Sequence, residues 1–275
     1  MGEMKKLSRS KLELFLECPR CFWLDQVKGV KRPPPAPYTI NSAIDHLLKQ
    51  EFDSYREKGE PHPIMTKHGV EAIPFAHPQL DKWRHNFTGV SHLHTPTGIH
   101  IYGAVDDIWV NPNGEVMVVD YKATGANQHQ IYDSYGRQME VYQWLLRRND
   151  LEVSPTGYFV FARVNKGNGF ASPSDLAAEA SAEKAAMKRN GKTGLLPFDI
   201  FVESHTGDDA WVEETIIGAA KLLEQTKAPV AAGDCEYCKY REAGHIEDLP
   251  KESAVPMVKK ILIPAKKSRV SNLGI

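Results

Sequence analysis

Runs of hydrophobic residues predict the strands of this chain. Two β-rich runs, residues 99–110 and 115–122, flank the sequence Asn-Pro-Asn-Gly at 111–114. Because these turn residues favour a tight reversal, we expect the two runs to form an antiparallel hairpin. The apolar run 158–164 predicts a buried strand, and 198–203 predicts another.

Apolar residues spaced three or four positions apart predict helices between these strands. Helices are expected over residues 7–24, 41–56, 128–148 and 210–225. The Ala- and Lys-rich segment 175–189 favours an exposed helical insertion. The proline-rich segment 33–37 predicts an extended connector, whereas the stretch 59–96 has weak periodicity. We therefore expect an α/β fold with a mixed central β-sheet flanked by helices.

The composition fits one sizeable domain. The chain has 275 residues, 41% of them hydrophobic, which suffices for one core. We expect a single domain over residues 1–250 and a basic tail over 251–275, with a core at about 40–205 and cysteine-bearing ends at about 7–25 and 230–242. The sequence has no apolar run that could span a bilayer and no apolar signal core, so we expect a cytoplasmic protein.

The net charge does not by itself indicate a nucleic-acid partner. It is -1 at pH 7, yet basic residues gather near both ends of the chain. These residues are Lys5, Lys6, Arg9 and Lys11 at the start, and Lys259, Lys260, Lys266, Lys267 and Arg269 in the tail. They could contact phosphates, or they could be solvated termini.

Four cysteines form two pairs with the spacing of metal ligands. The pairs are Cys18 with Cys21 and Cys235 with Cys238. Thiols stay reduced in the cytoplasm, so this pattern favours a shared metal or cluster over disulfides. Four thiolates suit either tetrahedral Zn²⁺ or a 4Fe-4S cluster, and the spacing does not separate the two.

Two acidic residues and a lysine in the predicted hairpin are candidates for a catalytic site. Asp120 and Lys122 are two residues apart in a strand, so their side chains share one face of the sheet. The hairpin can bring Asp106 beside them. Two close carboxylates repel one another unless a cation neutralises them, and oxygen ligands suit Mg²⁺ or Mn²⁺. Lys122 could then orient water or stabilise charge on a phosphate.

These residues resemble the motifs of a known nuclease family. Gly103-Ala-Val-Asp106 followed by Asp120-Tyr-Lys122 is similar to the core of the PD-(D/E)XK nuclease superfamily. Gln138 and Tyr142, four residues apart on one predicted helical face, resemble the RecB-like branch of that superfamily. The resemblance implies that Gln138 and Tyr142 help to position the site or DNA. It also implies a metal held by His46, Asp106, Asp120 and the main-chain carbonyl of Tyr121.

The two ends of the chain carry a second part of the resemblance. The opening, from Leu7-Ser8 to Cys18-Pro19-Arg20, and the later Cys235-Glu-Tyr-Cys238 are similar to CRISPR adaptation exonucleases and AddB-type nuclease subunits. In those relatives one cysteine from the front and three from the back hold an iron-sulfur cluster. This chain has two at each end, so Cys21 would supply the missing ligand. The resemblance implies a 4Fe-4S cluster, with Zn²⁺ as the alternative.

Two other patterns are not functional sites in this interpretation. Gly191-Lys192-Thr193 imitates a phosphate-binding loop, but Ala186 stands where such a loop requires glycine, so no ATPase motor is expected. Three histidines lack matched acidic or cysteine partners, and we interpret them as structural: His92, His94 and His100.

The resemblance implies a metal-dependent DNA nuclease. We expect an exonuclease that acts on DNA ends or single strands in repair, recombination or CRISPR adaptation and leaves a 5′ phosphate. Its protein partners would be a separate helicase or CRISPR adaptation proteins. The alternatives are an endonuclease and, from another class, a noncatalytic DNA-binding module that keeps the fold and the cysteine site.

Overall fold

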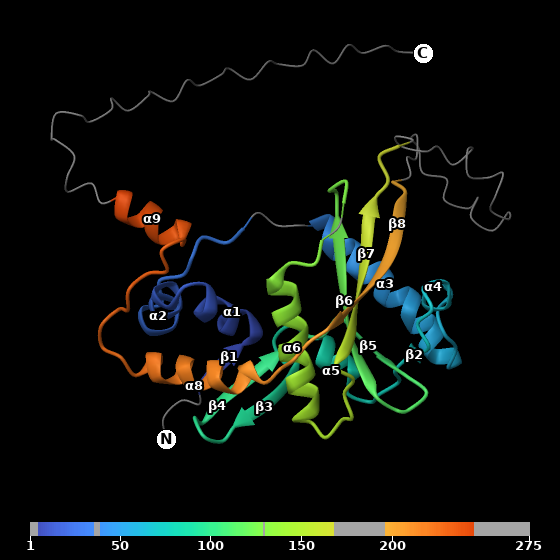
Figure 1. Ribbon diagram of the computed structural model, residues 1–275, viewed down its shortest axis with the longest axis horizontal. Helices are drawn as coiled ribbons and strands as arrows, with labels where there is room; N and C mark the ends of the chain where they lie inside the picture. Colours follow the sequence, from blue (N-terminus) through green and yellow to red (C-terminus); the bar gives the residue numbers. More distant parts are fainter. Residues whose placement is uncertain (1–4, 36–38, 129, 168–195, 245–275) are drawn as a thin grey trace, which may run out of the picture. The chain divides into compact units, whose positions relative to one another are not determined.

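The computed structural model describes residues 5–35, 39–128, 130–167 and 196–244 (Figure 1). The chain divides into two compact units, residues 1–235 and 236–275. The described part of the second unit contains one helix, α9 (Glu236–Ala243). All other elements belong to the first unit.

A five-stranded sheet forms the centre of the first unit. Its strands, in spatial order, are β2 (Ile73–Pro74), β5 (Asp107–Val110), β6 (Val116–Thr124), β7 (Thr156–Val164) and β8 (Phe198–Thr206). Strands β6 and β7 run parallel, and the other neighbouring pairs are antiparallel. The predicted mixed α/β fold is therefore confirmed, as are the hairpin β5–β6 and the two strands after it.

Two helices cover opposite faces of this sheet, as Figure 1 shows. Helix α3 (Thr39–Lys58) buries Ile44, Leu48 and Phe52 against Val119 and Tyr121 of β6 and their neighbours. Helix α6 (Asp133–Arg147) contacts the alternate residues of β6. The two-residue repeat of a strand thus places Val119 and Tyr121 under α3 and Asp120 on the opposite face, beside α6.

A second, three-stranded sheet divides one predicted strand into two. This sheet has the order β1 (Lys6–Ser8), β4 (Ile99–Gly103) and β3 (Val90–His94). The predicted single run 99–110 is wrong, because β4 lies in the small sheet and β5 in the large one. The chain changes sheets at residues 104–106, where the Val105 N–H donates to the Trp83 carbonyl at 3.2 Å. Trp83 belongs to α5 (Leu80–Arg84).

The predicted helix 7–24 is also corrected. After β1 the chain forms α1 (Arg9–Glu17) and α2 (Pro19–Lys28), with extended backbone at Cys18 between them. Proline at the first position of α2 explains the division, because its fixed φ suits a helix start and it lacks the N–H that an interior position needs.

The helices from the start of the chain pack against α8 (Trp211–Leu223) near the end of the first unit. The Trp23 indole donates to the Gln225 carbonyl at 2.9 Å, and Arg20 Nε donates to the Pro229 carbonyl at 2.9 Å. Segments about two hundred residues apart in sequence are thereby held together.

The remaining predictions have mixed outcomes. Helices α3 and α8 confirm the predicted helices 41–56 and 210–225, but α6 begins at Asp133, five residues later than predicted from 128. The weakly periodic stretch 59–96 contains α4 (Pro63–Lys67), β2, α5 and β3. The predicted insertion helix 175–189, Gly191-Lys192-Thr193 and the tail 251–275 lie outside the described residues. Within the part of the chain that the structure describes, no helix is long and apolar enough to cross a membrane.

Candidate active site

Asp106 lies where the chain passes from one sheet to the other. Its Oδ2 accepts a hydrogen bond from the Tyr121 N–H at 3.0 Å, which ties the carboxylate to the end of β6 that β5 does not pair with. Its Oδ1 lies 3.6 Å from Lys49 Nζ, and this ammonium also contacts Asp45 at 2.8 Å. Both Asp45 and Lys49 come from α3, so one helix supplies both an acid and a base beside Asp106.

Asp120 forms a hydrogen-bonded ring with Lys122 and Gln138. Its carboxylate is fully buried and pairs with Lys122 Nζ, and its Oδ1 accepts from Gln138 Nε2 at 2.7 Å. Lys122 Nζ also lies 3.4 Å from Gln138 Oε1, and Gln138 Nε2 lies 3.3 Å from the Tyr142 hydroxyl. Burial raises the pKa of Tyr142 to about 12, so its phenol stays protonated at neutral pH. The structure thus brings the predicted residues Asp106, Asp120, Lys122, Gln138 and Tyr142 together.

The charges of the site favour a bound cation. Burial, and then the negative charge of Asp120, raise the pKa of Asp106 to about 7, while Lys49 and Lys122 act in the opposite direction. Two carboxylates that oppose each other's ionisation need a positive partner. Hard oxygen donors of this kind fit Mg²⁺ or Mn²⁺, so the residues present fit the divalent ion that the sequence predicts.

The predicted ligand His46 lies on α3 with an exposed side chain. The neighbouring residue Asp45 is the α3 acid whose carboxylate shares Lys49 with Asp106. Sequence reasoning missed Asp45 and Lys49, although a pair of opposite charges four residues apart on one helical face is a recognisable signal.

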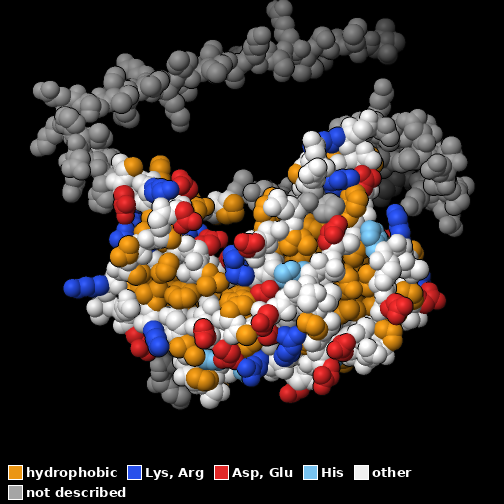
Figure 2. Space-filling view, in the orientation of Figure 1, with side chains coloured by type: hydrophobic (Ala, Val, Ile, Leu, Met, Phe, Trp, Pro, Cys, Tyr) orange, Lys and Arg blue, Asp and Glu red, His pale blue; other side chains and the backbone are white. Residues whose placement is uncertain are grey.

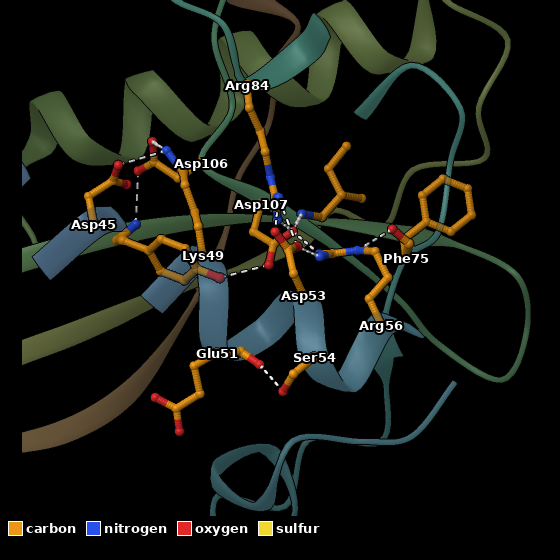
Figure 3. Close-up of polar contacts among 12 residues, drawn as sticks. Asp45, Lys49, Glu51, Asp53, Ser54, Arg56, Phe75, Arg84, Asp106 and Asp107 are labelled. Carbon is orange, nitrogen blue, oxygen red and sulfur yellow. Dashed lines mark hydrogen bonds and ion pairs between the residues drawn. The ribbon is translucent and has the colours of Figure 1, made fainter. Parts of the chain in front are cut away.

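A buried charge network behind the site holds Asp107, the residue next to Asp106 (Figure 3). The Asp107 carboxylate is fully buried and pairs with Arg56 and with Arg84, the latter at 2.7 Å. Both guanidinium groups also contact Asp53. The Tyr121 hydroxyl donates to Asp107 Oδ2 at 2.7 Å. Burial, and then the negative charge of Asp107, raise the pKa of the Tyr121 hydroxyl far above its usual range. Two acids and two bases neutralise one another here, so Asp107 is saturated while its neighbour Asp106 faces the site.

The cysteines near the two ends of the chain are candidates for a second metal site. Cys18, Cys21 and Cys235 belong to the first unit and are buried. Cys21 Sγ and Cys235 Sγ are 3.6 Å apart. Burial raises the pKa of the Cys18 thiol, but hydrogen bonds from the backbone of Ala232 and Cys21 and from neighbouring thiols outweigh it and lower the pKa to about 7. A thiol so stabilised as thiolate is a suitable metal ligand.

The histidines predicted to be structural include one with a clear packing role. His94 is 2% exposed, and its two ring nitrogens contact Thr97 Oγ1 at 2.8 Å and Glu213 Oε2 at 2.6 Å. Glu213 belongs to α8, so the contact joins the small sheet to that helix. His92 packs edge-on against Trp144 of α6.

On the side that Figure 2 shows, the charged side chains of the described residues do not gather into one large basic patch. Figure 2 shows Lys and Arg side chains interspersed with Asp and Glu over the viewed side of the described residues.

Comparison with protein families identifies this arrangement. The sequence model of the PD-(D/E)XK nuclease superfamily matches residues 6–243. The chain belongs to the PD-(D/E)XK nuclease superfamily. Members of this superfamily are nucleases, and hence hydrolases, that use divalent metals and act on DNA.

Other comparisons add little to the superfamily assignment. A solved structure described as "Crystal structure of SSO0001" is similar at 14% sequence identity and a TM-score of 0.36, covering 83% of this chain and 81% of that one. No curated protein matches the chain.

The buried network generates a prediction about stability. Asp107→Asn keeps the shape of the side chain but leaves Arg56 and Arg84 with Asp53 as their remaining acid. Breaking a buried ion pair in this way should lower the free energy of unfolding by about 3–5 kcal/mol, measured by urea denaturation. The control Asp209→Asn removes the partner of the more exposed Arg147 and should cost about 1 kcal/mol or less. Equal losses in the two variants would contradict a special role for Asp107.

The raised pKa of Asp106 generates a prediction about pH. In metal-free wild type, folding favours the protonated carboxyl, so its contribution to stability is full below the ordinary value of 3.8 and is lost as pH rises towards about 7. Asp106→Asn cannot ionise, so its melting temperature relative to wild type should rise from pH 4 to pH 7 and then level off. Thermal melts in chelator test this, and a pH-independent difference would refute it. Added Mn²⁺ should reverse the order at pH 8, because it stabilises wild type through binding.

Proposed function

We propose that this protein is a metal-dependent DNA nuclease whose active site is built on Asp106, Asp120 and Lys122. The observation that carries the proposal is the convergence of these three side chains between α3 and α6, where the charge of Asp120 helps to raise the pKa of Asp106. A surface ion pair in a strand would not need a second, half-buried carboxylate beside it.

The ligands of the ion would be Asp106, Asp120 and the main-chain carbonyl of Tyr121. The Tyr121 N–H donates to Asp106, and in a strand the N–H and C=O of one residue point to the same side, so its carbonyl faces the same carboxylate. From α3 we retain His46 as the ligand predicted by sequence, and the contacts of Asp45 make it the competing donor. A bound divalent cation would supply charge neutralisation at the phosphate and activation of water.

The chain's own residues would orient the reacting groups. Lys122 is held by Asp120 and Gln138, so its ammonium is fixed rather than free to rotate on a long side chain. In that position it can donate a hydrogen bond to water or to a phosphate oxygen and stabilise developing negative charge. Gln138, fixed in turn by Tyr142, acts as a positioning residue for both Asp120 and Lys122.

The finer substrate assignment rests on the motifs. Gln138 and Tyr142 on α6, and the paired cysteines at both ends, support membership of the RecB-like branch, in which exonucleases that act on DNA ends and single strands occur. We therefore propose exonuclease activity in DNA repair, recombination or CRISPR adaptation. A separate helicase or CRISPR adaptation proteins would be the partners.

The proposal predicts metal-dependent cleavage that requires Asp120. Wild type should degrade end-labelled linear DNA with Mg²⁺ or Mn²⁺ and not with chelator. Asp120→Asn should reduce the rate by at least about a thousandfold, because it removes charge stabilisation that a transition state needs. Cleavage products resolved on a gel would also report the polarity. The matched control is Asp199→Asn, near the start of β8, where Asp199 pairs with Arg163 of β7. This variant should cleave DNA like wild type.

Two outcomes would contradict this account. DNA binding without cleavage in every metal would favour the noncatalytic DNA-binding module. Efficient cutting of closed circular DNA would replace the exonuclease with an endonuclease while leaving the active site unchanged.

We propose that the four cysteines hold a metal centre, for which the resemblance supports 4Fe-4S and the sulfur spacing supports Zn²⁺. Thiolates about 2.3 Å from one tetrahedral ion lie about 3.8 Å from each other, close to the 3.6 Å between Cys21 and Cys235. A cluster places several iron atoms between its thiolates and needs wider spacing. The distance therefore favours a single Zn²⁺.

Metal analysis of anaerobically purified protein tests this assignment. We expect about one Zn²⁺ per chain, no visible charge-transfer absorbance, and a lower melting temperature after strong chelation. The Cys21→Ser variant should lose the metal while retaining Asp106, Asp120 and Lys122. Iron and sulfide in equal amounts, with a visible absorbance band, would establish the iron-sulfur cluster instead.

A further inference from the structure

We propose that Tyr132 and Tyr135, at the start of α6, form a stacking platform for a base of an unpaired DNA strand. The inference rests on the proposed nuclease function and names the form of DNA that its site would accept. It is carried by a pocket beside the active site, by the contacts of Tyr135 and by the exposure of Tyr132.

The pocket next to Lys122 is too small to enclose a nucleotide. It has a volume of about 220 Å³ and is lined by Asn41, Ile44, Asp45, Tyr121, Lys122, Ala123 and Tyr135. Pockets that enclose a small organic ligand usually have about 300–1,000 Å³. The polar lining suits a phosphate and its cation, so a base attached to that phosphate must rest on the rim of the pocket.

Tyr135 supplies an aromatic surface at this rim. Lys122 Nζ lies 4.6 Å from the centre of its ring, a favourable cation–π distance. The ring also packs at 6.0 Å against Phe159, a fully buried core residue of β7. Tyr135 is therefore fixed between the catalytic lysine and the core.

Tyr132 adds a second aromatic ring beside Tyr135, perpendicular to it and open to solvent. Its side chain is 53% exposed, and its ring lies 5.2 Å from that of Tyr135 at an angle of 87°. The backbone between them is also fixed, because the Tyr135 N–H donates to the Tyr132 carbonyl at 2.8 Å as α6 begins. An exposed aromatic ring on a rigid helix start loses little entropy when a base stacks on it.

Stacking of this kind distinguishes unpaired strands from duplexes. In a duplex both faces of a base are covered by its neighbours, whereas an unpaired base can place one face on an aromatic side chain. A strand whose phosphate lies beside Lys122 would present the adjoining base to Tyr135 or Tyr132. The platform would thus select single-stranded DNA, or the frayed end of a duplex, without reading its sequence.

Binding measured in the absence of cleavage tests the platform. Fluorescence anisotropy in chelator would compare wild type, Tyr132→Ala and Tyr132→Phe on a labelled single strand and on its duplex. Phe87→Ala is the matched control, because Phe87 is 85% exposed and packs beside His85 alone among the described rings. A series of strands with one abasic position moved along the sequence locates the stacked base.

Tyr132→Ala should weaken single-strand binding about tenfold. Tyr132→Phe and Phe87→Ala should change the single-strand affinity less than about twofold, and no variant should change the duplex affinity by more than that. One abasic position should weaken wild type to the level of Tyr132→Ala and have no further effect on that variant. Unchanged binding by Tyr132→Ala, or an equal loss at every abasic position, would overturn the platform.

Cleavage assays separate this failure from that of the proposed function. If wild type cleaves DNA while Tyr132→Ala binds and cleaves identically, the platform is wrong and the nuclease stands. If wild type binds single strands through Tyr132 but cleaves none in any metal, the nuclease is wrong and the platform stands. If wild type binds no single strand in chelator but cleaves DNA with metal, the platform is wrong and the nuclease stands; if it neither binds nor cleaves DNA, both are overturned.

Discussion

The electrostatic repulsion between Asp106 and Asp120 determines how the site is organised. Desolvation of Asp106 by burial, and then the negative charge of Asp120, raise the pKa of Asp106 to about 7. Lys49 of α3, together with Lys122 and the Tyr121 N–H of β6, offsets part of this repulsion. A fold that spends stability to keep two carboxylates together is expected where a cation binds, because the same charges that destabilise the empty site provide its affinity.

Adjacent acids in this site have opposite roles. Asp107 is enclosed by Arg56, Arg84 and the Tyr121 hydroxyl and has no capacity left for a ligand, whereas Asp106 remains half-buried beside the pocket. The change of sheet at residues 104–106 makes this possible. Asp106 lies in the connection between the two sheets and Asp107 begins β5, so the two neighbouring carboxylates enter different surroundings. Tyr121 links the two, since its backbone holds Asp106 and its hydroxyl holds Asp107.

Local patterns predicted the parts of this structure that depend on local geometry. The two-residue repeat correctly placed Asp120 and Lys122 on one face, and the two cysteine pairs pointed to thiols that lie close together, such as Cys21 and Cys235. The strand break at 104–106 was missed because β-rich sequence continues through it, and the Trp83 contact that breaks it is distant in sequence. The network around Asp107 was missed for a similar reason: it joins Asp107 of β5 to Arg56 of α3 and Arg84 of α5, and these elements are distant in sequence. Which α3 side chain faces the metal site depends on how the helix is rotated about its axis. The hydrophobic pattern of α3 does not separate the neighbouring residues Asp45 and His46 in this respect.

Anomalous diffraction from crystals of the wild-type protein soaked in Mn²⁺ tests the central claim most directly. The account predicts a manganese peak bonded to carboxylate oxygens of both Asp106 and Asp120 at about 2.0–2.6 Å, which is absent in Asp120→Asn crystals soaked in the same way. The nearest α3 side chain would then decide between Asp45 and His46. A manganese ion bound elsewhere, or none at these carboxylates above pH 7, would contradict the account.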